Sequence, residues 1–239
     1  MKALIVPDVH MKFEDMIDTI HDVWGQYRPD VLVFLGDYFD DWGKTGDDML
    51  YWRTIDMLKY IREDFPTVFL LGNHDIPYLL DEPQRYSSDN PEVRQSIKKC
   101  LLDINPYIVY EIAGVLLSHA GFINEPTPKL RRRWSELPDV DRYHLANASS
   151  GPLWVRPDEL ELVGNVQQPQ VVGHSPVKQA TVFKTPASSI IVIDTWSTYS
   201  NGKPIGDCDM YLLTNGQLQS IKHGLIPWNQ KEDVNAIER

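Results

Sequence analysis

The stretch FLLGNHDIPYLL, residues 69–80, decides how the first half of the chain folds. It begins as an apolar run typical of a buried strand and then turns at once to Gly72, Asn73, His74 and Asp75. In α/β folds, chemistry collects beyond the carboxyl ends of parallel strands. Amide, imidazole and carboxylate side chains in this place therefore indicate a functional site at the end of the strand.

The residues before this stretch repeat the same alternation of strand and helix. Segments 2–7 and 30–36 are short apolar runs, which predict buried strands. Segments 13–27 and 47–64 carry apolar side chains at helical spacing, so each predicts an amphipathic helix. Together with a strand at 67–72, the order β-α-β-α-β predicts a parallel sheet with right-handed crossovers.

The second half of the chain is richer in strands. Residues 106–121 contain two apolar runs joined near Ala113 and Gly114, which predicts a hairpin. From residue 169 onward one apolar run follows another, and Asn215–Gly216 is a typical hairpin turn. Because the strands of both halves need one core, we predict an α/β fold in which two sheets form a sandwich with helices outside.

The composition fits one soluble domain. The chain has 239 residues, 42% of them hydrophobic, and we place the domain at 1–222 and a loosely held polar tail at 223–239. A net charge of −11 argues against non-specific nucleic-acid binding. The N-terminal apolar run is too short for a signal peptide or a membrane span, and Cys100 and Cys208 make no disulfide framework. We expect a cytoplasmic protein without a membrane partner. The sequence does not predict its oligomeric state.

Polar side chains follow five of the predicted strands. They are Asp8 and His10, Asp37 and Asp40, Asn73 and His74, His119, and His174. Taken singly, each has an ordinary alternative, since Asp is common in turns and a buried His is often a core residue. Their recurrence in one structural context favours a metal site of O and N ligands, which suits Mn, Fe, Ni or Zn. The number of ligands suggests two ions that share one carboxylate, a common arrangement for hydrolysis of phosphate esters.

These motifs resemble those of the calcineurin-like metallophosphoesterases, especially the small bacterial and phage-type phosphoprotein phosphatases. The resemblance rests on Asp8-x-His10, GDYFD (36–40), GNHD (72–75), SHAG (118–121) and GHSP (173–176). It implies a four-layer αββα arrangement with two mixed sheets.

The resemblance also implies a role for each polar residue. Asp8, His10 and Asp37 would hold the first metal. Asp37, Asn73, His119 and His174 would hold the second, and Asp37 would bridge the two ions. Asn73 would also contact substrate. His74 would act as the general acid, oriented by Asp40.

The expected activity is hydrolysis of phosphate monoesters by in-line attack of a metal-bridging hydroxide, with a phosphopeptide or a small phosphoester as substrate. Mn²⁺ is the expected metal, with Fe, Zn and Ni as alternatives. An alternative substrate class is nucleotides, such as diadenosine polyphosphates or terminal phosphates of nucleic acid. A non-catalytic scaffold would be expected to lack some of the ligands, and none is missing here.

The sequence departs from the phosphatase pattern at several positions. Asp41 stands where an Arg that clamps phosphate is common, and Pro176 stands where many metallophosphoesterases have a second His. LWVRPDEL (153–160) resembles the family's Trp-x-Arg segment, which implies Arg156 as the candidate phosphate clamp. A guanidinium suits this role because it can bind two phosphate oxygens at once; the alternative is a surface arginine before a helix that starts near Pro157.

Two further groups of residues are open to two interpretations. The basic run Arg131, Arg132 and Arg133 could rim the pocket or lie on the solvated face of a helix. The tryptophans near the site segments could stack on a nucleobase or pack in the core. They are Trp42, Trp134, Trp154 and Trp196. Trp196 follows IDT (193–195), where the family that the chain resembles often has Gly, and this implies a narrower pocket.

Overall fold

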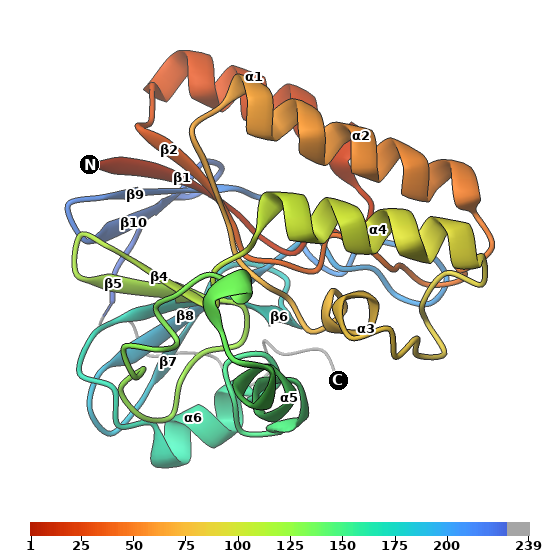
Figure 1. The fold of residues 1–239 in the computed structure, drawn as a ribbon. Coiled ribbons are helices and arrows are strands. Elements are labelled where there is room, and N and C mark those ends of the chain that lie inside the picture. The colour runs from red at the N-terminus through yellow and green to blue at the C-terminus, as the bar shows by residue number, and fades with distance from the viewer. Residues whose placement is uncertain (229–239) are drawn as a thin grey trace.

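The computed structural model describes residues 1–228, which fold around two packed sheets (Figure 1). The first sheet has the strand order β11-β10-β9-β1-β2-β3, and the second has the order β4-β5-β6-β8-β7. The strands of the first sheet are β1 (Lys2–Val6), β2 (Val31–Phe34), β3 (Thr67–Phe69), β9 (Tyr211–Thr214), β10 (Gln217–Ser220) and β11 (Gly224–Ile226). Those of the second are β4 (Val109–Ile112), β5 (Val115–Ser118), β6 (Gln170–Pro176), β7 (Thr181–Lys184) and β8 (Ser189–Asp194).

Helices cover the outer face of each sheet. Figure 1 shows α1, α2 and α4 over the first sheet and α5 and α6 beyond the second. Their bounds are α1 (Phe13–Tyr27), α2 (Asp48–Asp64), α3 (Ile76–Leu79), α4 (Pro91–Ile104), α5 (Asp139–Asn147) and α6 (Pro157–Val163), with a short 3₁₀ turn, η1, at Trp134–Glu136. The predicted α/β sandwich of two mixed sheets is confirmed.

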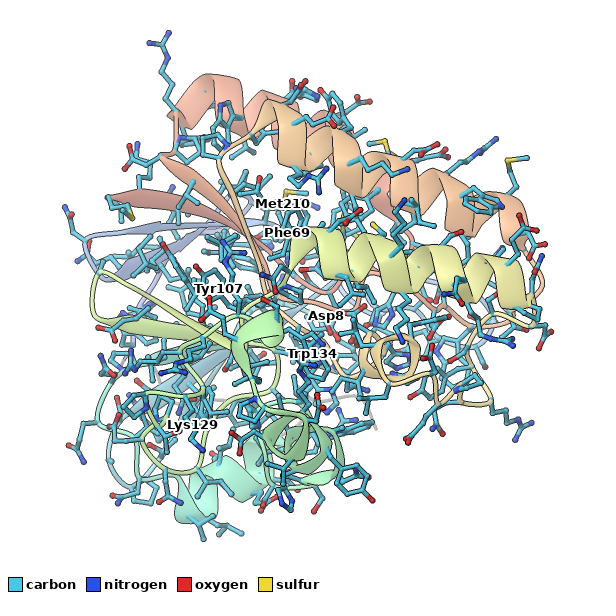
Figure 2. The ribbon with its side chains drawn as sticks, viewed as in Figure 1. Asp8, Phe69, Tyr107, Lys129, Trp134 and Met210 are labelled. Carbon is cyan, nitrogen blue, oxygen red and sulfur yellow. The ribbon has the colours of Figure 1, made fainter. Side chains whose placement is uncertain are left out.

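Successive residues of each central strand contribute side chains to different layers of the core. In β1, Ala3 and Ile5 join the apolar layer between the sheets, whereas Leu4 lies on the side covered by the helices. This alternation follows from the pleat of a strand, which points successive side chains to opposite faces. Figure 2 labels Phe69 and Met210, which belong to the same helix-covered layer as Leu4.

The predicted parallel unit is confirmed, because β1 pairs in parallel with β2 and β2 with β3. The two hairpins are confirmed as well, with Ala113 and Asn215 at positive φ in their turns. No helix was predicted at 91–104, although Asn90 caps α4 there through its side chain and Pro91 starts it.

The structure differs from expectation at two other places. In the basic run, only the single turn η1 forms, so Arg131 and Arg132 do not lie on a helix. Strand β11 pairs with β10 through Gly224–Ile226, so the sheet continues past the expected boundary at residue 222. The rest of the expected tail, 229–239, lies outside the described residues. Among residues 1–228, no helix has the length and apolar character needed to cross a membrane.

Candidate metal centre and active site

The five strand ends meet at one rim of the sandwich. Asp8 follows β1, Asp37 follows β2 and Asn73 follows β3, while His119 follows β5 and His174 lies in β6. Parallel pairing of β1 with β2, of β2 with β3 and of β5 with β6 brings their carboxyl ends together. The predicted ligands therefore lie in one cluster, although they come from positions far apart in the sequence.

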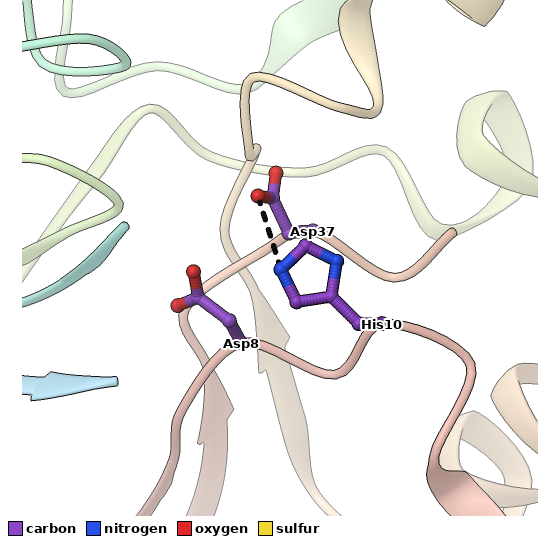
Figure 3. Close-up of side chains that lie close together, drawn as sticks. All are labelled: Asp8, His10 and Asp37. Atoms are coloured by element: carbon purple, nitrogen blue, oxygen red, sulfur yellow. Dashed lines mark ion pairs between the residues drawn. The ribbon is translucent and has the colours of Figure 1, made fainter. Parts of the chain in front are cut away.

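Three of the predicted ligands form a compact group. Asp8, His10 and Asp37 each offer a ligand atom, and these atoms lie within 4.8 Å of one another. Figure 3 shows the three side chains facing each other, with His10 Nε2 3.7 Å from Asp37 Oδ2. His10 and Asp37 both have positive φ, at 43° and 50°. Such backbone conformations are costly for residues other than glycine and cluster at functional sites.

The other ligands gather around the Asn73 side chain. Its Oδ1 atom lies 2.7 Å from His119 Nε2 and 2.9 Å from His174 Nδ1. His119 Nε2 is also 3.5 Å from Asp37 Oδ2, the same oxygen that His10 approaches. Asp37 Oδ2 therefore lies between the two groups, where a bridging ligand is needed.

Each of the three imidazoles has a backbone carbonyl oxygen beside one of its ring nitrogens. His10 Nδ1 lies 2.8 Å from the Asp40 carbonyl oxygen, His119 Nδ1 3.0 Å from that of Leu35, and His174 Nε2 3.2 Å from that of Trp154. Burial lowers the pKa of all three imidazoles to about 3, so each is neutral and carries only one hydrogen. When that hydrogen is donated to the backbone carbonyl, the opposite ring nitrogen presents a lone pair.

Each of these lone pairs faces an oxygen that cannot donate to it. His10 Nε2 faces the Asp37 carboxylate, and His119 Nε2 and His174 Nδ1 face the Asn73 carbonyl oxygen. Acceptors that face acceptors at such distances repel one another unless a cation lies between them. Hydrogen bonds from the opposite ring nitrogen to carbonyls are typical of metal-binding histidines. The residues present therefore fit divalent metal ions.

The carboxylates of the cluster also require a positive charge. Burial, followed by repulsion from Asp194 and Asp37, raises the pKa of Asp8 well above its usual range. Asp8 Oδ1 is buried without a hydrogen-bond partner, while Oδ2 accepts from the His174 backbone N–H at 2.9 Å. An unpartnered buried carboxylate oxygen is costly, and coordination to a metal ion relieves that cost.

Asp75 was missed by the sequence analysis as a part of the site. Its carboxylate is fully buried and accepts hydrogen bonds from the backbone N–H groups of Gly72, Asp37 and Tyr38 at 2.9–3.1 Å. It thereby fixes the loop after β3 against the loop after β2. Its position directly after His74 was the available signal.

His74 and Asp40 lie beside the cluster in the arrangement that the sequence predicted. His74 Nδ1 is 3.7 Å from Asp40 Oδ2, and neither atom has another partner. Burial lowers the pKa of His74, but Asp37 and Asp40 outweigh it and raise the pKa to about 8. A separation of this size is common before substrate binds, when catalytic hydrogen bonds are often long.

Three tyrosines around this pair were not found from the sequence. Tyr51 and Tyr78 both donate from their hydroxyls to Asp40 Oδ1, Tyr51 at 3.0 Å. The ring of Tyr86 contacts the ring of His74 with a centroid separation of 4.2 Å. These contacts hold the carboxylate and the imidazole in place, and they arise from elements too distant in sequence to be recognised in advance.

The cluster opens into a cavity of about 1490 Å³. Arg156 lines it, and its Nη1 donates to the His174 carbonyl oxygen and to Ser175 Oγ. Asp41 also lines it, but its carboxylate pairs with Lys12 at 3.3 Å and accepts from Thr198 at 2.9 Å. The Asp41 carboxylate therefore links its own loop to the loops that contain Lys12 and Thr198.

The remaining sequence candidates are divided between the cavity and the core. Trp42 and Trp154 line the cavity, whereas Trp134 and Trp196 are buried in the apolar core, so the expectation that Trp196 narrows the pocket is wrong. The basic run does not rim the cavity. Arg131 pairs with Glu111, and Arg133 lies over the ring of Tyr107.

A comparison with known protein families agrees with the metal site that the geometry indicates. Residues 1–203 match the family model described as calcineurin-like phosphoesterase. The chain belongs to this family. This phosphoesterase is therefore a metal-dependent hydrolase of phosphoric esters. The comparison with curated proteins gives no significant match.

Solved structures share the fold of this phosphoesterase at low sequence identity. A cold-active protein tyrosine phosphatase is 19% identical with a TM-score of 0.59, over 92% of this chain and 75% of that one. A protein serine/threonine phosphatase from Saccharomyces cerevisiae is 14% identical with a TM-score of 0.54, over 100% and 79%. A metallophosphoesterase from Sphaerobacter thermophilus is 13% identical with a TM-score of 0.51, over 96% and 89%.

Proposed function

We propose that this protein is a phosphomonoesterase of the phosphoprotein phosphatase type, which removes phosphate from side chains of peptides or proteins. The observation that carries the proposal is the set of three neutral imidazoles whose lone pairs face the oxygens of Asp37 and Asn73. These O and N donors suit two divalent ions, and we propose manganese because no cysteine takes part.

The ligands divide into two sets around Asp37. Asp8 and His10 would hold one ion and Asn73, His119 and His174 the other, with the Asp37 carboxylate shared. Ions bound there would acidify a water for attack on phosphorus and neutralise the charge of the phosphate. The chain contributes the fixed positions of these side chains, which buried backbone hydrogen bonds hold in place.

His74 and Arg156 would act on the substrate. Nδ1 of His74 faces Asp40, which leaves Nε2 to donate a proton to the departing alkoxide. Asp40, held by Tyr51 and Tyr78, would keep the imidazole oriented. Arg156, which lines the cavity next to His174, would bind phosphate oxygens.

The size of the cavity supports a peptide substrate. At about 1490 Å³ it is larger than most small-molecule sites, which span roughly 300–1,000 Å³. A nucleotide substrate is the second candidate, because Trp42 lines the cavity with 63% of its surface exposed and presents a face on which a base could stack.

A substrate panel tests the proposal. The protein is stripped of metal, reloaded with Mn²⁺, Fe²⁺, Zn²⁺ or Ni²⁺, and assayed on phosphoserine, phosphothreonine and phosphotyrosine peptides, nucleotides, dinucleoside polyphosphates and phosphodiesters. We expect about two ions per chain and the highest kcat/KM on a phosphopeptide with Mn²⁺. Preferred turnover of a dinucleoside polyphosphate would replace the peptide proposal, and full activity after verified metal removal would overturn the two-metal site.

A further inference from the structure

A tight turn between α3 and α4 presents two side chains to the cavity. The Ser87 backbone N–H donates to the Gln84 carbonyl oxygen at 3.0 Å, and the Gln84 N–H donates to Ser87 Oγ at 3.1 Å. These bonds make Arg85 and Tyr86 the central residues of the turn. Both line the cavity, and the Tyr86 ring contacts His74.

The turn is anchored to the network that orients His74. The Ser88 backbone N–H donates to the Tyr78 hydroxyl at 3.0 Å, and that hydroxyl donates to Asp40. On the far side of the turn, Arg94 donates to the carbonyl oxygens of Ser88 and Asp89. The backbone of the turn is therefore held beside the imidazole, and the Arg85 side chain extends from it at the surface.

Arg85 differs from the other cations of the cavity in being unpaired. Arg156 donates to His174 and Ser175, and Lys184 donates to the Trp228 carbonyl oxygen. Of the lysines and arginines among residues 1–228 that line the cavity, Arg85 alone has no hydrogen bond or ion pair from its side chain. A free guanidinium in a protein of net charge −11 is a specific point of attraction for an anion.

The place of Arg85 relative to His74 indicates which part of a substrate it meets. A general acid lies next to the leaving-group oxygen, and Tyr86, whose ring contacts His74, directly follows Arg85 in the same turn, so the turn lies on the leaving-group side of the phosphate. We propose that Arg85 forms a subsite for an acidic side chain near the phosphorylated residue, so that the preferred substrates are acidic phosphopeptides. This inference rests on the proposed phosphatase function and on the role of His74 within it.

Two matched peptides test the subsite. They carry the same phosphoserine and differ only in flanking Glu or Gln residues, and each is also made as a non-hydrolysable phosphonate. For the wild-type protein with Mn²⁺ we expect kcat/KM and affinity to favour the Glu peptide by about twofold to fivefold, the range for an ion pair of an exposed arginine. Arg85→Gln should remove the preference, and Arg85→Glu should reverse it.

Arg132 provides the matched control. It is exposed, lies outside the cavity and has no side-chain partner among the described residues, so Arg132→Glu changes the net charge equally and should keep the wild-type preference. Equal affinity of the wild-type protein for the two phosphonates, or equal effects of Arg85→Glu and Arg132→Glu, would overturn the subsite. So would an Arg85 dependence seen with nucleoside polyphosphates and absent with peptides.

The phosphonate titrations separate this inference from the proposed function. A preference for the Glu phosphonate that depends on Arg85, without turnover of either peptide, would support the subsite and refute the phosphatase proposal. If both peptides are turned over and Arg85→Glu leaves the ratio of their kcat/KM values unchanged, the phosphatase proposal is supported and the subsite is refuted.

Discussion

Gly173 is a position at which the addition of one methyl group should damage the metal centre. A Cβ atom added there would lie 1.8 Å from Asp8 Oδ1 and 2.9 Å from Asp8 Cγ. Ordinary contact begins near 3.4 Å, so Gly173→Ala must push the carboxylate oxygen by more than an ångström. Misplacement by about 1 Å costs about 100-fold in rate even at a distance from the chemistry. We therefore expect at least a 100-fold fall in kcat/KM and loss of about one ion per chain.

The loss of metal from the Gly173→Ala variant is measured directly, and its folding is checked separately. Metal content is determined after loading with excess Mn²⁺ and gel filtration, and far-UV circular dichroism checks that the variant is folded. Gly25→Ala is the control, because the added methyl group meets nothing within 4 Å and Gly25 lies in α1, where alanine should stabilise the helix by about 0.5–1 kcal/mol. A folded Gly173→Ala protein that keeps two ions and wild-type turnover would refute the assignment of Asp8 as a ligand held against β6.

The other predictions concern the proposed roles of single side chains. Asp37→Asn should lower metal content more than Asp8→Asn does, because Asp37 Oδ2 lies near ligands of both sets; retention of two ions and near-normal turnover would exclude a bridge. His74→Ala should reduce turnover of phosphoserine by about 10²–10⁴-fold and that of a nitrophenyl ester distinctly less, since phenolate leaves without a proton. Equal losses on both esters with metals retained would assign His74 to binding. Arg156→Ala should raise KM and weaken inhibition by inorganic phosphate, and unchanged inhibition would leave Arg156 as a residue that only ties α6 to β6.

Local pattern was enough to predict the sheet framework. The buried strand at β1 and the helix α1, which begins and ends at the predicted residues 13 and 27, follow from the spacing of apolar side chains over a few positions. The strand-end ligands could be proposed for the same reason. A carboxylate or an imidazole directly after a buried strand can adopt few orientations. The residue type alone shows which ligand atoms it offers.

The other features of the site depend on contacts between residues that are far apart in the sequence. No local sequence pattern indicates that such residues lie together. Asp75 was given no individual role from the sequence, and its role is visible only in the three backbone N–H groups that donate to its carboxylate. Trp196 lies close to a site segment along the chain, yet it is buried and donates to the Asp209 carbonyl oxygen.

The turn that contains Arg85 is a further feature that could not be predicted from the sequence. Its sequence is polar and unremarkable, and only packing against Tyr78 and His74 brings it to the cavity. The sequence by itself determined most of the strands, though not β11, and which atoms are able to bind metal, since burial and ligand chemistry are local properties. The tertiary structure alone decided which side chains share one site, since proximity depends on how two sheets and their loops pack.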